Sequence, residues 1–226
     1  MKVRLSDILA PHYCLSCGEI GSILCEYCKY DITSEAYGKC IKCGHISPAS
    51  SNLCRGCAVP YSMAWCVGER QDMLEAILDA YKFNRTKSAA KVLGSLLDAS
   101  LPALPKDIVV TYVTTIRPHI RQRGYDHARL IAKDFAKRRG LKCQGTLIRT
   151  SDTRQLGANR RQRIENAKRA FVPKPSIENQ TYLLIDDIYT TGSTLEYATK
   201  ALRKADASNV MIAVIARQPL EKTHHL

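Results

Sequence analysis

The sequence predicts an α/β protein in which a parallel sheet is flanked by helices and preceded by a small metal-binding domain. Two observations lead to this fold class. Apolar runs of strand length alternate with segments of helical periodicity over residues 70–220, the pattern of a parallel sheet with crossover helices. Eight of the ten cysteines lie in the first 57 residues, where they form four Cys-x-x-Cys pairs.

The four cysteine pairs have the spacing of thiolate ligands to zinc. Each pair places two thiolates on one tight turn, and two pairs complete a tetrahedral site. No secretory segment begins the sequence, so metal in a reducing compartment is favoured over disulfides. A crossed grouping, with the first pair joined to the third, has compatible spacing, and an iron–sulfur cluster is a further alternative. The simplest grouping is sequential and predicts two structural zinc ions, one held by Cys14, Cys17, Cys25 and Cys28, the other by Cys40, Cys43, Cys54 and Cys57.

The domain boundaries follow from composition. Residues 1–58 form the expected zinc-binding domain, which has few large apolar residues and needs metal to fold. Residues 59–69 resemble a linker, residues 70–220 form the main domain with its own core, and residues 221–226 are a polar tail.

Within the main domain, helical and strand patterns follow one another. The helix that begins at Arg70 places Met73, Leu74, Ile77, Leu78 and Tyr81 on one face. Gly140 is a good residue to follow the end of another helix. Further helices are expected over 89–101, 125–139 and 193–205, and strands over 108–113, 143–148, 183–185 and 210–216.

The chain is strongly basic, with a net charge of +13, and the excess is concentrated in two blocks. Residues 117–139 hold eight Lys or Arg against two Asp, and residues 149–169 hold seven against one Asp and one Glu. Such blocks suit a polyanion, either a pyrophosphate group or a nucleic-acid backbone, although a solvated basic face is the simpler alternative. No apolar stretch reaches the roughly 18 residues of a membrane span, so we expect a cytoplasmic protein without membrane insertion.

Residues 182–194 combine a short apolar strand, two acids, a hydroxyl-rich turn and the start of a helix. Amides at a helix start, together with the helix dipole, favour an anion, and Gly192 lets the backbone approach a phosphate closely. Asp186 and Asp187 can accept hydrogen bonds from sugar hydroxyls. The segment therefore predicts a sugar-phosphate site, against the plainer alternative of a capped strand–turn–helix with solvated acids. Residues 114–117 follow another strand and should lie at the same edge of the sheet.

Residues 182–194 resemble the phosphoribosyl pyrophosphate (PRPP) loop of type I phosphoribosyltransferases. The resemblance implies that Asp186 and Asp187 bind the ribose 2′- and 3′-hydroxyls, and that PRPP binds with Mg²⁺. It also implies that Thr115 and Arg117 contact the pyrophosphate. The 5′-phosphate would be held by Thr190, Thr191, Gly192, Ser193 and Thr194.

Further segments narrow the resemblance to the ComF family, a group of competence-associated phosphoribosyltransferase-like proteins with an N-terminal double zinc ribbon. These segments are Tyr81-Lys82-Phe83, residues 121–125, residues 149–166 and Ala170-Phe171, in that order. Asp126-His127 stands where the family usually has Asn-Gln.

The family resemblance implies a PRPP-binding protein that handles single-stranded DNA during natural transformation, with a helicase-like competence protein as a further partner. Aromatic residues could stack on bases, although a place in the core or against the sugar is favoured for each: Tyr81, Phe83, Tyr112, Tyr125 and Tyr189. The basic blocks indicate the arginines most suited to the DNA backbone: Arg121, Arg123, Arg160, Arg161 and Arg163.

Two other functions fit the same motifs. A metabolic phosphoribosyltransferase would transfer ribose 5-phosphate from PRPP to an amine or base, and a regulator would sense PRPP without transforming it. The sequence singles out no catalytic residue that would decide between them.

Overall fold

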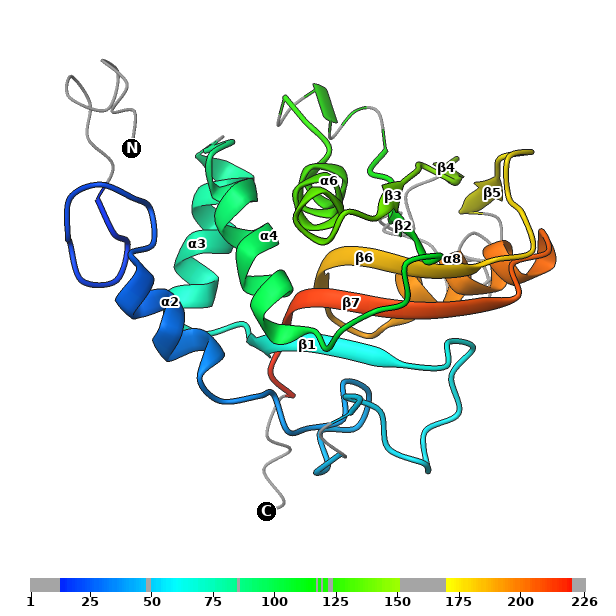
Figure 1. Ribbon diagram of the computed structural model, residues 1–226, viewed down its shortest axis with the longest axis horizontal. Helices are drawn as coiled ribbons and strands as arrows, with labels where there is room; N and C mark the ends of the chain where they lie inside the picture. Colours follow the sequence, from blue (N-terminus) through cyan, green and yellow to red (C-terminus); the bar gives the residue numbers. More distant parts are fainter. Residues whose placement is uncertain are drawn as a thin grey trace, which may run out of the picture.

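A five-stranded parallel sheet forms the centre of the protein (Figure 1). The computed structural model describes residues 13–47, 50–84, 86–116, 118, 120, 121, 124–150 and 170–220. All neighbouring strands in the sheet run parallel, as predicted. The spatial order is β1 (Ala64–Glu69), β7 (Asn209–Arg217), β6 (Thr181–Tyr189), β2 (Val109–Tyr112) and β3 (Lys142–Cys143). A separate antiparallel ribbon consists of β4 (Leu147–Arg149) and β5 (Phe171–Pro173).

The helices of the main domain begin and end close to where the sequence predicts, whereas α2 of the cysteine-rich segment was not predicted. Asp126 caps the start of α6 by accepting a hydrogen bond from the Arg129 amide, and Gly140 ends that helix with φ of 64°. This left-handed conformation is the one that glycine adopts at little cost. The helices are α2 (Glu26–Thr33), α3 (Asp72–Phe83), α4 (Ala89–Ser100), α6 (His127–Arg139) and α8 (Ser193–Lys204).

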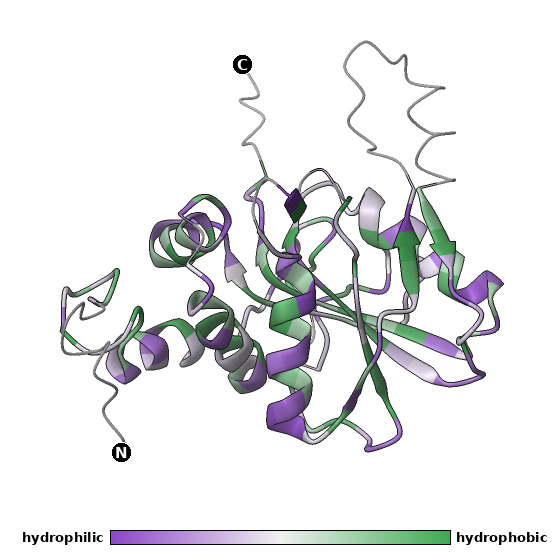
Figure 2. Cartoon of the chain, turned by 90° about the horizontal axis from the view of Figure 1, so that it is seen from above, coloured by the Kyte–Doolittle hydropathy of each residue, from purple (hydrophilic) through white to green (hydrophobic). Residues whose placement is uncertain are grey.

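The sheet separates two hydrophobic cores. Successive side chains of a strand point to opposite faces, so Leu183 and Ile185 of β6 join one core while Tyr182 and Leu184 join the other. Helices α3, α4 and α6 cover the first face, and α8 covers the second (Figure 1). Figure 2 shows hydrophobic residues concentrated in the strands and hydrophilic residues on the outer surfaces of the helices. No helix in the described ranges has the length and hydropathy that crossing a bilayer requires.

The cysteine-rich segment divides into two modules that pack on opposite faces of the sheet. The first module, residues 13–33, buries Ile23 and Leu24 in the core beneath α3 and α4. The second module, residues 37–57, buries Ile41 in the core beneath α8. Both modules therefore contribute residues to the two cores of the main domain.

The proposed linker, residues 59–69, contains a strand of the main sheet. Ala64–Glu69 forms β1 and pairs with β7 along the sheet edge, with Trp65 and Cys66 buried. The sequence did not reveal this strand, because a run of six residues shows no clear periodicity.

One expected strand is two strands in the structure. Residues 143–148 were predicted to be continuous, but the chain leaves β3 after Cys143 and enters β4 at Leu147. Gly145 lies at this break, and a Cβ there would press against the Tyr112 side chain. The close approach favours glycine at the point where the chain leaves the sheet.

Candidate functional site

The two acids of the PRPP-like segment lie at the carboxyl end of the sheet. Strand β6 continues through Asp186 and Asp187 to Tyr189, whereas neighbouring β2 ends at Tyr112, which pairs with Ile185. Both acids therefore extend beyond the end of β2. In parallel α/β sheets this edge is where ligands bind.

The two carboxylates have different partners. Asp187 Oδ2 lies 2.8 Å from Lys82 Nζ at the end of α3, and both side chains are largely buried. Asp186 Oδ1 accepts a hydrogen bond of 2.9 Å from the Asp187 amide. Only one of the two acids is thus matched by a cation at hydrogen-bond distance in the described part of the chain.

This difference separates the pKa values of the two acids. Burial, reinforced by the negative charge of Asp187, raises the pKa of Asp186 to about 8. Burial also opposes ionisation of Asp187, but the Lys82 ammonium outweighs it and lowers the pKa of Asp187 below its usual value. The pKa values of the two acids are therefore shifted in opposite directions, so that protonation is favoured at Asp186 and ionisation at Asp187.

The turn after the acids presents its hydroxyls beside the start of α8. Thr191 Oγ1 and Ser193 Oγ lie 3.0 Å apart, and Thr190, Thr191 and Ser193 are exposed. Gly192 precedes the helix with φ of 80°. The first amides of a helix have no carbonyl partner within it, so this end of α8 offers donors to an anion.

Gly192 is required by the protein's own packing as well as by its backbone angle. A Cβ at this position would overlap the ring and hydroxyl of Tyr189, which is buried directly beside it. The sequence suggested only that Gly192 makes room for a phosphate. The contact with Tyr189 is a second reason for glycine at this position.

Thr115 lies on the loop after β2 and is held by Asp126. The Asp126 carboxylate accepts hydrogen bonds from the Thr115 amide at 3.2 Å and from its hydroxyl at 3.3 Å. Asp126 is itself buried, and burial raises its pKa. The residue that departs from the usual family pattern thus joins the loop after β2 to the start of α6.

An aromatic cluster connects the end of α3 to the start of α6, next to Asp186 and Asp187. The rings of Tyr81, Tyr125 and His127 lie with centroids 4.8 to 5.2 Å apart. The Tyr81 hydroxyl donates to the His127 carbonyl, and the Tyr125 hydroxyl donates to the Tyr81 carbonyl. This cluster fixes the end of α3, where Lys82 reaches Asp187. Sequence reasoning noted the Tyr81-Lys82-Phe83 segment but did not place Lys82 in the site.

Most of the arginines expected to bind ligands lie outside the part of the chain that the structure describes. Arg117, Arg123, Arg160, Arg161 and Arg163 lie outside the described residues. Arg121 is described and exposed. Of the aromatic residues considered for base stacking, Phe83 is 66% exposed, whereas the four tyrosines (Tyr81, Tyr112, Tyr125 and Tyr189) are buried.

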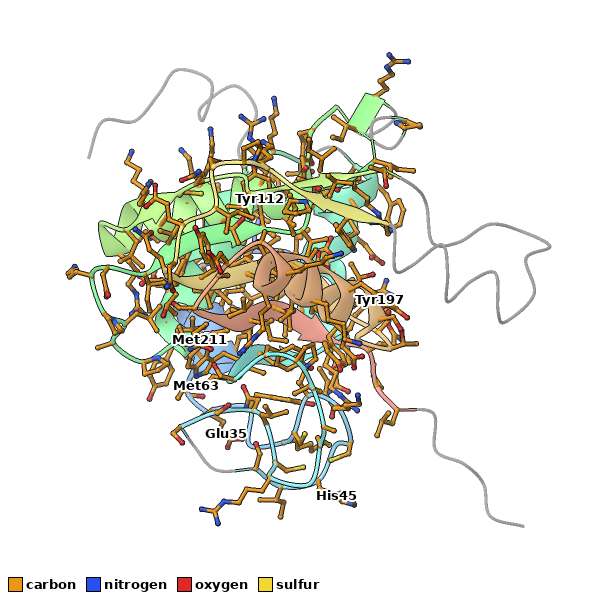
Figure 3. The ribbon with its side chains drawn as sticks, turned by 90° about the vertical axis from the view of Figure 1, so that its right-hand side faces the viewer. Glu35, His45, Met63, Tyr112, Tyr197 and Met211 are labelled. Carbon is orange, nitrogen blue, oxygen red and sulfur yellow. The ribbon has the colours of Figure 1, made fainter. Side chains whose placement is uncertain are left out.

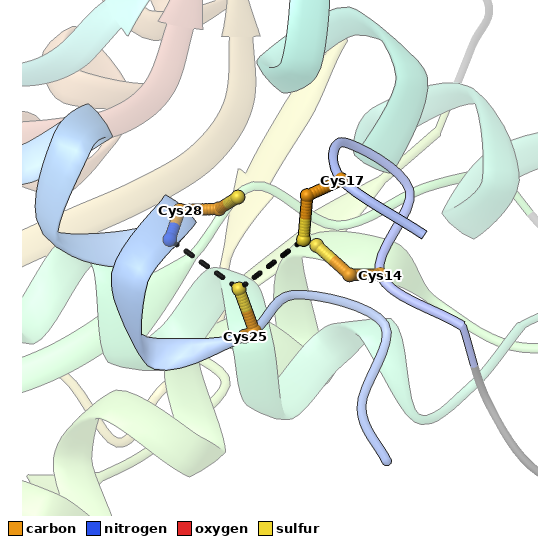
Figure 4. Close-up of side chains that lie close together, drawn as sticks. All are labelled: Cys14, Cys17, Cys25 and Cys28. Carbon is orange, nitrogen blue, oxygen red and sulfur yellow. Dashed lines mark hydrogen bonds between the residues drawn. The ribbon is translucent and has the colours of Figure 1, made fainter. Parts of the chain in front are cut away.

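The eight paired cysteines form two groups of four, each with its ligand atoms within 4.8 Å of one another. The grouping is sequential, so the crossed alternative was wrong: Cys14, Cys17, Cys25 and Cys28 in one group, Cys40, Cys43, Cys54 and Cys57 in the other. Figure 4 shows the first group converging from a turn and the start of α2.

The sulfur spacing fits a tetrahedral ion. A Zn–S bond of roughly 2.3 Å places the sulfurs of a tetrahedron about 3.8 Å apart. The Sγ atoms of Cys17 and Cys25 are 3.6 Å apart, and those of Cys40 and Cys57 are 3.8 Å apart. Partial burial disfavours the thiolate, but donation from backbone amides lowers the pKa of Cys14 and of Cys40 to about 6. Each group therefore has the sulfur spacing that structural zinc needs, and one thiol of each group is shifted toward the thiolate.

Comparison with known proteins agrees with this arrangement. Residues 120–225 match the phosphoribosyl transferase domain family. Competence protein F of Haemophilus influenzae is 26% identical over 209 residues, covering 86% of this chain and 90% of that protein. The DNA utilization protein YhgH of Escherichia coli K12 is 24% identical over 223 residues, covering 86% and 96%. Among solved structures, a PRPP amidotransferase from B. subtilis matches 57% of this chain and 26% of its own, with 20% identity and a TM-score of 0.42.

The parallel sheet, with its acidic pair and hydroxyl-rich turn before α8, defines a phosphoribosyltransferase-like domain. The two Cys₄ groups precede this domain, and competence protein F and YhgH each match 86% of the chain. The chain is therefore similar to ComF proteins, with a phosphoribosyltransferase-like domain that follows two Cys₄ groups.

Proposed function

We propose that this protein binds PRPP, together with Mg²⁺, at the carboxyl edge of its sheet. The observation that carries the proposal is the placement of the Asp186–Asp187 pair beside the start of α8. A sugar diol and a phosphate ester could meet both features at once, since carboxyl oxygens accept from hydroxyls while helix amides donate to phosphate.

Each segment has a distinct part in this proposal. The carboxyl groups of Asp186 and Asp187 would bind the ribose hydroxyls, with Lys82 keeping Asp187 ionised. The turn at residues 190–194 would hold the 5′-phosphate, and Thr115, with Arg117, would contact the pyrophosphate. Bound Mg²⁺ would neutralise charge on the pyrophosphate oxygens.

We further propose that the protein acts in natural competence and handles single-stranded DNA in the cytoplasm. The names of its relatives, competence protein F and DNA utilization protein, support this role. The net charge of +13 supports contact with a polyanion. The helicase-like partner expected from the family belongs to the same proposal.

Binding and turnover should be measured on the same zinc-loaded protein. Calorimetric titration with Mg-PRPP tests the ligand, and fluorescence titration with a labelled oligonucleotide tests the DNA. Incubation with PRPP and a panel of bases and amines, with pyrophosphate release as the readout, tests the alternative of a metabolic phosphoribosyltransferase. Absence of Mg-PRPP binding would overturn the ligand assignment, and steady pyrophosphate release with one acceptor would favour the enzyme.

A further inference from the structure

The second cysteine module is joined to the first turn of α8 by an ion pair. Lys42, which lies between Cys40 and Cys43, places its Nζ 2.7 Å from Glu196 Oε1 and 3.3 Å from the Ala58 carbonyl oxygen. The amide of Glu196 in turn donates to the Gly192 carbonyl at 2.9 Å. The Lys42 side chain, from the turn between two proposed metal ligands, therefore contacts α8. This helix begins at residues 190–194, the proposed phosphate loop.

A second connection runs through the backbone of the same module. Ile41 is fully buried under α8, and its carbonyl accepts a hydrogen bond of 2.6 Å from Arg217 Nε. Arg217 is buried at the end of β7, where it pairs in register with Tyr189. The next residue, Gln218, donates its amide to the Tyr189 carbonyl at 2.8 Å.

Tyr189 lies between the second cysteine module and the proposed phosphate loop. Its side chain lies against Gly192, and its hydroxyl is 3.4 Å from the Tyr61 hydroxyl in the same core as Ile41. In Figure 3 the second module, marked by His45, lies below the sheet, and α8, marked by Tyr197, lies in front of it. The first module packs on the opposite face of the sheet, in the other core.

We propose that the second Cys₄ module positions the phosphate loop, with Lys42 as the positioning residue, so that loss of metal from this module weakens sugar-phosphate binding without any direct contact between metal and ligand. A tetrahedral thiolate site fixes the turn that carries Lys42. Without the ion, the turn that carries Lys42 becomes more mobile and the ion pair with Glu196 is lost. A smaller fraction of the molecules then has the phosphate loop in the conformation that binds ligand. The apparent affinity falls in proportion to that fraction.

The order of the loop can be measured without any ligand. Hydrogen exchange of residues 190–197 should be followed in the unliganded, zinc-loaded protein for Lys42→Met and Glu196→Gln. We expect exchange about three- to fivefold faster in both variants, the upper range for an ion pair of this exposure. Lys42→Arg should restore slow exchange, because it keeps the ion pair.

Lys39→Met is the matched control. Lys39 lies in the same module and forms an ion pair of 2.8 Å with Glu69 of β1, which is separated from β6 by β7. Its loss should leave the exchange of residues 190–197 unchanged. Equal acceleration in the Lys39 and Lys42 variants, or none in either, would overturn the proposal.

The role of the metal is tested by removing one ligand from each module. Cys43→Ser should accelerate exchange at residues 190–197 and raise the Kd for Mg-PRPP more than Cys17→Ser does, with zinc content measured for both. Similar effects of the two substitutions would mean a general loss of stability and would contradict the proposal. If a cysteine variant does not fold, the Lys42 variants still test the positioning role, since they retain all eight thiols.

The measurement of affinity for Mg-PRPP rests on the proposed function, whereas the measurement of hydrogen exchange does not. A wild-type protein that fails to bind Mg-PRPP refutes the ligand assignment alone. A wild-type protein that binds Mg-PRPP, with unchanged exchange and affinity in Lys42→Met, refutes the positioning role alone.

Discussion

Lys82 Nζ lies 2.8 Å from Asp187 Oδ2, and this ion pair joins the end of α3 to the acidic pair at the end of β6. The lysine neutralises one carboxylate of a pair that would otherwise carry two adjacent negative charges. The other acid, Asp186, has no such partner within ion-pair distance among the described residues, and burial raises its pKa to about 8. The two adjacent acids therefore differ in how readily they ionise.

Asp187→Asn should weaken Mg-PRPP binding by about 1–3 kcal/mol, because it replaces a charged hydrogen-bond acceptor in the proposed ribose site. Calorimetry at pH 7 measures the change. Asp98→Asn is the control, since it also breaks an ion pair, with Arg139, but on α4 away from the site. Equal affinities for wild type and the Asp187 variant would show that this carboxylate does not bind the ligand.

Asp186→Asn should stabilise the unliganded protein at pH 8 and have little effect near pH 4. A carboxyl whose pKa is raised on folding contributes stability below its unfolded value, 3.8, which is lost as pH rises through the folded value of about 8. Asparagine does not ionise, so the variant does not lose this stability as pH rises. We expect a gain of at least about 1 kcal/mol at pH 8, or roughly 2–4 °C in Tm. A constant difference in Tm from pH 4 to pH 8 would contradict the shifted pKa.

Gly192→Ala should destabilise the protein more than Gly140→Ala. Both glycines have positive φ, 80° and 64°, so both substitutions cost about 1 kcal/mol in backbone strain. A Cβ at Gly140 meets no atom within 4 Å, whereas at Gly192 it overlaps Tyr189. The free energy of unfolding, measured with urea, should therefore fall further for Gly192→Ala than for Gly140→Ala, and the difference measures the cost of that overlap. Gly192→Val should be worse still, and equal costs for the two alanine variants would contradict the contact with Tyr189.

Metal analysis of protein purified under reducing conditions should give two zinc ions per chain, because the structure provides two separate groups of four thiols. Chelation should lower the Tm of the main domain as well as unfold the cysteine modules, since Ile41 and Leu24 are buried in its two cores. Iron in place of zinc, or a main-domain transition unaffected by chelation, would contradict these expectations.

The sequence predicted the sheet and the acidic pair because both depend on local patterns. The run Leu183–Ile185, the two acids and Gly192 are contiguous, so their joint meaning could be read directly. Lys82 could not be placed in the same way, because its distance from Asp187 depends on how the end of α3 packs against α6. Strand β1 was missed for a related reason: its six residues are identified as a strand only by pairing with β7.

The cysteine groups show the same limit. Spacing defined the four pairs but could not decide between sequential and crossed grouping, which depends on the path of the chain between pairs. Ile41 also looked unremarkable in the sequence. Its burial under α8 arises because the second module packs against the main domain rather than standing apart from it.

Single-stranded DNA binding should be tolerant of sequence and should fall steeply with salt, because each phosphate contact releases counterions. Combined alanine substitution of Arg160, Arg161 and Arg163 should reduce both the affinity and the salt slope. Alanine substitution of Lys200, Arg203 and Lys204, at the far end of α8, removes the same charge and is the control. Equal losses in the two triple variants would mean that net charge alone attracts the DNA.

The DNA path should overlap the PRPP site, since Arg121 is exposed on the segment that leads to Asp126, which holds Thr115 at the carboxyl edge of the sheet. If the two ligands compete, saturating Mg-PRPP will raise the Kd for an oligonucleotide, and the oligonucleotide will raise the Kd for Mg-PRPP by the same factor. Reciprocal titrations at constant ionic strength measure both factors, with magnesium pyrophosphate as a control for simple anion competition. An oligonucleotide affinity that is unchanged by Mg-PRPP would separate the two sites, and no affinity even at low salt would remove the DNA role altogether.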